Sequence, residues 1–144
     1  MVIILLAIAV LAAVVSSFPK VQNQVKEFLF KPNRLVLAKI NTYYGIEQKE
    51  YLILKIKDES GLQIEIYEMQ GNSGQIFKQK FELTQDSDAY ITLDKNTTNL
   101  ALSDVDKDGV LDILAPSVDR NGNLRLNAFR FNLEFNSFEP LEQK

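Results

Sequence analysis

The chain falls into two stretches that differ in how apolar and polar side chains follow one another. Residues 2–15 read VIILLAIAVLAAVV and contain no polar side chain. From Val21 to Leu29 the apolar residues recur at helical spacing among polar ones, and Pro32 then stops a helix. The pattern therefore predicts one long helix over residues 1–31, apolar all round in its first half and amphipathic in its second.

Exposing the first half of this predicted helix to water is energetically unfavourable. Leaving the Val, Leu and Ile side chains of residues 2–15 exposed costs on the order of 15–30 kcal/mol. The total stability of a small domain is only about 5–15 kcal/mol. The segment must therefore be removed, lie in a bilayer, or pack against other protein chains. In the last case the residues expected to form the assembly face are Ile3, Leu6, Val10, Val14, Phe18, Val21, Val25 and Phe28.

Three interpretations of the apolar segment are open. A cleaved secretory signal fits its length and the small residues at Val15–Ser17, but no Lys or Arg precedes the apolar run. A membrane anchor from Val2 to Phe18 would span about 25 Å, and the basic residues after it would place the rest of the chain in the cytoplasm. A chain already processed from a precursor with a basic leader could instead carry an extracellular domain.

After Pro32 the apolar residues alternate with polar ones at a period of two, which predicts antiparallel strands separated by Gly- and Asn-containing turns. The expected fold class is therefore α+β: the long N-terminal hydrophobic helix followed by an all-β antiparallel domain over residues 32–144. Within this domain RLVLAKINTYYG aligns with NLALSDVDKDG, and YLILKIKDESGLQIEIYE with LDILAPSVDRNGNLRLNAFR. These matches predict two blade-like four-stranded repeats, about 34–84 and about 99–143. Two blades cannot close a propeller, so they should pack face to face or against neighbouring subunits.

The amino-acid composition excludes several classes of catalytic site, metal site and binding partner. The 144 residues include no Cys and no His, which excludes thiol catalysis, a Ser-His-Asp triad and almost every zinc or iron site. A net charge of −3 makes nucleic acid an unsuitable partner. We therefore expect a protein that is not an enzyme.

The segment DVDKDGVLD, residues 104–112, is the most specific motif in the chain. Its alternating acids on a tight loop point oxygen atoms at one centre, Gly109 allows the sharp turn, and the backbone carbonyl of Val110 is expected to face inward. Hard oxygen ligands of this kind suit Ca²⁺. The predicted calcium ligands are Asp104, Asp106, Asp108, Val110 (through its carbonyl) and Asp112. The motif is not an EF-hand, because Ala115 occupies the position of the bidentate glutamate.

Two family resemblances follow from these segments. LLAIAVLAAVVSSFPKVQNQVKEF resembles the N-terminal helix of type IV pilins, although Leu5 stands where those subunits carry a glutamate. LALSDVDKDGVLDILAP resembles the calcium loops of FG-GAP and VCBS-type repeats of integrin-like propellers and bacterial surface proteins. Together they imply a structural subunit of an extracellular, pilus-like helical filament, made of copies of this chain that pass through a membrane before assembly. The alternative is a membrane-anchored or secreted, calcium-dependent binding module at the cell surface.

Overall fold

The computed structural model describes residues 34–83 and 86–141, which are all β apart from one 3₁₀ turn at Gly71–Ser73. The α+β class predicted from the sequence is therefore wrong for the described residues. Over most of these strands apolar and polar residues alternate at a period of two, which favours strands and not helices. The predicted helix over residues 1–31, with its assembly face from Ile3 to Phe28, lies outside the described residues. No helix among those described is long and apolar enough to cross a membrane.

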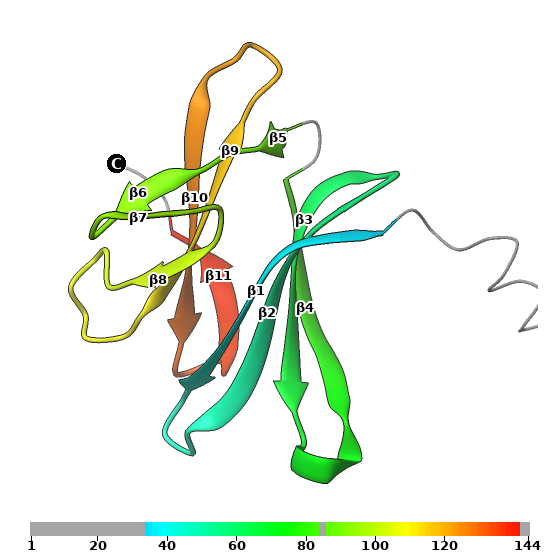
Figure 1. The fold of residues 1–144 in the computed structure, drawn as a ribbon. Helices are drawn as coiled ribbons and strands as arrows, with labels where there is room; N and C mark the ends of the chain where they lie inside the picture. Colours follow the sequence, from blue (N-terminus) through cyan, green and yellow to red (C-terminus); the bar gives the residue numbers. More distant parts are fainter. Residues whose placement is uncertain (1–33, 84–85, 142–144) are drawn as a thin grey trace, which may run out of the picture. The chain divides into compact units, whose positions relative to one another are not determined.

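The first sheet is an antiparallel meander in which each strand pairs with the next along the chain (Figure 1). Its strands, in the order β1-β2-β3-β4, are β1 (Leu35–Tyr44), β2 (Lys49–Asp58), β3 (Gly61–Met69) and β4 (Gln75–Leu83). β1 and β4 are therefore the edges of this sheet.

The second sheet contains a meander of the same order, with an additional short strand. Its strands are β8 (Ala101–Ser103), β9 (Asp112–Val118), β10 (Leu124–Asn132), β11 (Ser137–Pro140) and β5 (Ser87–Asp88). Both β8 and β5 pair with β9, β8 at its beginning and β5 at its end. A separate ribbon joins β6 (Ile91–Leu93) to β7 (Asn96–Thr98). The two repeats inferred from the sequence remain a prediction.

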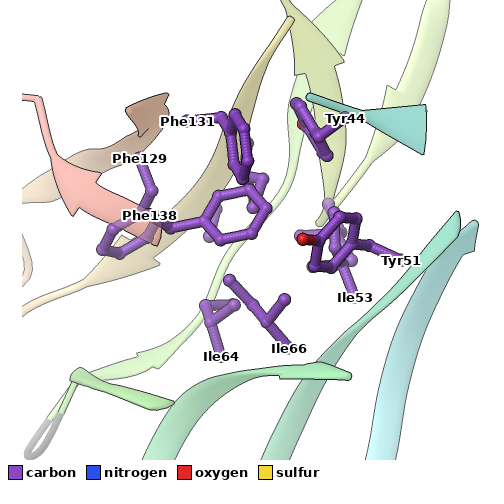
Figure 2. Packing of buried hydrophobic residues seen from close by; sticks show 11 residues of the cluster. Tyr44, Tyr51, Ile53, Ile64, Ile66, Phe129, Phe131 and Phe138 are labelled. Atoms are coloured by element: carbon purple, nitrogen blue, oxygen red, sulfur yellow. The ribbon is translucent and has the colours of Figure 1, made fainter. Parts of the chain in front are cut away.

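The two sheets share one hydrophobic core (Figure 2). Alternation places Ile53 on β2 and Ile64 and Ile66 on β3 against this core, each fully buried. They pack against a cluster of aromatic side chains that both sheets contribute. Burial of each isoleucine or phenylalanine side chain stabilises the fold by about 1.5–3 kcal/mol. The aromatic residues of the core are Tyr44, Tyr51, Phe129, Phe131 and Phe138.

A side-chain amide joins the edges of the two sheets. Gln79 on β4 donates a hydrogen bond from Nε2 to the carbonyl oxygen of Phe138 at 2.6 Å. The backbone N–H of Phe138, on β11, donates in return to Oε1 of Gln79 at 3.0 Å. The amide thus pairs with a backbone residue as a peptide group would, and it satisfies both polar groups of Phe138.

Replacing Gln79 with alanine should destabilise the fold by about 1–3 kcal/mol, because it leaves both polar backbone groups of Phe138 without their partner. Urea unfolding of the variant against wild type measures the loss. Gln75→Ala is the matched control, since Gln75 lies exposed on the same strand. Equal stability of the two variants would show that the amide contributes nothing specific.

Candidate metal centre

The acidic loop connects β8 to β9 and depends on two residues in the left-handed backbone region. Lys107 has φ +62° and Gly109 has φ +88°. A Cβ atom added at Gly109 would meet no heavy atom within 4 Å, so the backbone conformation and not space favours glycine there. The two turns fold residues 104–111 into a tight loop at the end of the short strand β8 (Figure 1).

Three carboxylates converge inside this loop. Asp104, Asp106 and Asp108 each offer an oxygen atom, and these oxygens lie within 4.8 Å of one another. The backbone N–H of Asp108 donates to Oδ1 of Asp104 at 3.1 Å, and the N–H of Gly109 donates to Oδ2 of Asp104 at 3.0 Å. Oδ1 of Asp108 accepts from the N–H of Val110 at 2.7 Å. The loop backbone therefore orients the acids, and the three of them could hold a metal ion.

Asp112, at the start of β9, is fully buried next to this group. Its Oδ2 accepts a hydrogen bond from the backbone N–H of Val105 at 2.8 Å. Its Oδ1 is also buried, and among the described residues it has no hydrogen-bond partner. An unpaired buried acceptor costs about 1–3 kcal/mol, and more when it is charged. This oxygen is therefore free to accept a hydrogen bond or to bind a cation.

The electrostatic environment of Asp112 also favours a bound cation. Burial raises the pKa of the Asp112 carboxyl, and the charges of Asp106 and Asp108 raise it further, against the lowering effect of the hydrogen bond from Val105. Besides Lys107 within the loop, a cation from β10 lies at the rim: Nη1 of Arg130 is 4.0 Å from Oδ2 of Asp106. Arg130 also pairs with Glu139 at 2.6 Å, so it offsets the charge of the loop only in part.

The structure brings together three of the five predicted ligands. Asp104, Asp106 and Asp108 form the converging group, whereas Asp112 is buried beside it and is not one of the three. Val110 donates its N–H to Asp108, and its side chain packs against the core. A ligand role for the Val110 carbonyl stays a prediction.

Comparison of the chain with protein-family models, with curated proteins and with solved structures found no match. The resemblances to type IV pilins and to FG-GAP and VCBS-type repeats therefore remain predictions from two segments of the sequence.

Sequence reasoning missed a second polar group, which lies between the two sheets. Lys55 is fully buried and pairs with Asp88, which also accepts a hydrogen bond from Asn99. One signal was available in the sequence. In YLILKIK, Lys55 shares its face of the strand with Tyr51 and Ile53, so period-two alternation directs this lysine into the core.

Proposed function

We propose that the chain is the calcium-stabilised structural subunit of an extracellular, pilus-like filament. The observation that carries the calcium site is the convergence of three acids beside the buried, unpartnered Oδ1 of Asp112. Oxygen ligands with variable geometry favour Ca²⁺ over transition metals, and calcium sites of modest affinity are typical of extracellular modules.

In this proposal the ion has a structural role. Asp104 and Asp112 flank the loop, at the end of β8 and the beginning of β9. A cation bound by both, together with Asp106 and Asp108, neutralises the repulsion among the acids and fixes the connection between the two strands. The carbonyl of Val110 completes the proposed ligand set. Every acid of the loop is used as a ligand, which supports a structural site over a catalytic one.

The filament part of the proposal rests on two groups of apolar residues. The first is the segment of residues 2–15, whose exposure to water costs more than a domain of this size can offset. The second is an apolar end of the β domain, defined by Ile46, Leu133 and Phe135, which are 93%, 54% and 70% exposed. Ile46 and Leu133 line one shallow hollow between the β1–β2 and β10–β11 turns. Exposed apolar groups that cluster in this way mark protein contacts, and we assign this end to the neighbouring copy.

Negative-stain microscopy and size-exclusion chromatography of the full chain from its native membrane test the proposal. Long fibres in calcium-containing buffer are the expected result. Ile46→Glu should shorten or abolish the fibres without changing thermal unfolding, because the side chain is 93% exposed. Leu124→Glu is the matched control, since Leu124 is 61% exposed and lies at the far end of β10 from Leu133. Monomers that require detergent would contradict the filament and support a membrane-tethered binding module.

A further inference from the structure

The buried lysine noted above lies where the two sheets meet. Lys55 belongs to β2 and its side chain is fully buried. Its Nζ donates to the backbone carbonyl oxygens of Asn99 at 2.8 Å and Pro116 at 2.5 Å. Its third contact is an ion pair with Oδ1 of Asp88 at 2.6 Å. Asp88 belongs to β5, Pro116 to β9 and Asn99 to the segment preceding β8. One amine therefore contacts two strands of the second sheet and the connection that leads into a third.

The carboxylate of Asp88 also holds the side chain of Asn99. Nδ2 of Asn99 donates to Oδ2 of Asp88 at 2.8 Å, and Asn99 is only 6% exposed. One carboxylate therefore contacts the amine of Lys55 with one oxygen and the amide nitrogen of Asn99 with the other. Both nitrogens are held in a site from which bulk water is largely excluded.

We propose that Lys55 and Asn99 form an intramolecular isopeptide bond, with Asp88 carrying the proton. This bond would join the first sheet covalently to the second, across a sequence separation of 44 residues.

The reaction balances without an oxidant, a reductant or a cofactor. Lys55 gives a proton to Oδ1 of Asp88, and the neutral amine attacks Cγ of Asn99. A C–N bond forms between Nζ and Cγ, and the bond between Cγ and Nδ2 breaks. Asp88 returns the proton to the departing nitrogen, which its Oδ2 already contacts. The ammonia that leaves takes up the second proton released from Nζ. A lysine ammonium and an asparagine amide thus become one secondary amide and one ammonium ion, and Asp88 is regenerated.

The surroundings favour each step. Burial lowers the pKa of the Lys55 amine, against the raising effect of its hydrogen bond and ion pair with Asp88, so less free energy is needed to form the neutral nucleophile. Exclusion of water also strengthens the electrostatic control of proton transfer and protects the product from hydrolysis. Positioning both groups on one carboxylate replaces a bimolecular encounter with an intramolecular one.

Mass spectrometry of the folded full chain tests the proposal. The expected mass is lower than the sequence mass by one ammonia. Trypsin cannot cleave after an acylated lysine, so digestion should release residues 50–57 joined to residues 96–107 as one branched peptide. Lys55→Met, Asn99→Ala and Asp88→Asn should each restore the full mass. Lys57→Met is the control, because Lys57 is an exposed lysine two residues further along β2. This variant should still have a mass that is one ammonia below its sequence mass.

Three outcomes would overturn the proposal. The first is a folded wild-type chain at its full sequence mass, a result that does not depend on whether any variant folds. The second is a loss of one water mapped to Lys55 and Asp88, since that bond would make Asp88 the acyl partner. The third is a loss of ammonia mapped to Asn121-Gly122, where succinimide formation releases the same molecule.

Discussion

Chelation of calcium lowers the midpoint of thermal unfolding of the full chain, with an expected shift on the order of 10 °C. When free calcium exceeds its dissociation constant a hundredfold, binding stabilises the folded state by about 2.7 kcal/mol. For a domain of this size, each kcal/mol of stabilisation raises the midpoint of thermal unfolding by several degrees. The loss arises because Asp104, Asp106 and Asp108 are then left to repel one another beside the unpartnered Oδ1 of Asp112. Scanning calorimetry with and without chelator measures the shift.

The double variant Asp106→Ala, Asp108→Ala should make this midpoint insensitive to calcium. In chelator it should unfold at the same temperature as wild type or slightly higher, because two repelling charges are gone. Glu59→Ala combined with Glu134→Ala is the matched control, since it removes the same charge from two exposed sites outside the loop. This control should keep the full response to calcium. A wild-type midpoint that chelator leaves unchanged would contradict a structural ion.

The second large effect concerns the aromatic core. Phe131→Ala should lower the free energy of unfolding by about 3–5 kcal/mol, a large fraction of the total stability of a small domain. Phe131 is 3% exposed, stacks on Tyr44 with ring centroids 5.2 Å apart, and contacts Phe138 at 5.0 Å. The truncation leaves a cavity where residues of both sheets meet, and the surrounding rings cannot refill it without moving the strands.

Phe135→Ala provides the matched comparison, because the same atoms are removed from a side chain that is 70% exposed. Its effect on the free energy of unfolding should stay within about 0.5 kcal/mol. Urea unfolding of both variants gives the two values. A similar cost at the two positions would mean that the rings do not form the core of the domain.

The alternation of apolar and polar residues is enough to locate most strands, because it is the pattern of a strand with one buried face. It does not fix where they end. The sequence pattern predicts a first strand over Leu35–Ile40. In the structure β1 continues to Tyr44, which pairs with Lys49. Residues 41–44 contain no acidic side chain, and each of them pairs with a residue of β2.

Features that depend on long-range contacts could not be predicted. The two-residue strand β5 has no alternation to detect, and it exists through its pairing with the end of β9. The spacing of the loop acids identifies Asp104, Asp106 and Asp108 correctly as a group. The sequence cannot show that Asp112 is buried with one unpartnered oxygen, because that property depends on how the loop packs against the core.

Calorimetric titration of Ca²⁺ into the full chain tests the central claim most directly. One calcium ion per chain should bind to wild type and to the Glu59→Ala, Glu134→Ala control, with weaker binding of Mg²⁺ because its smaller ion demands a stricter octahedral geometry. The Asp106→Ala, Asp108→Ala variant should bind neither ion. Absence of binding to the wild-type chain, or equal binding to the double loop variant, would contradict a calcium centre in this loop.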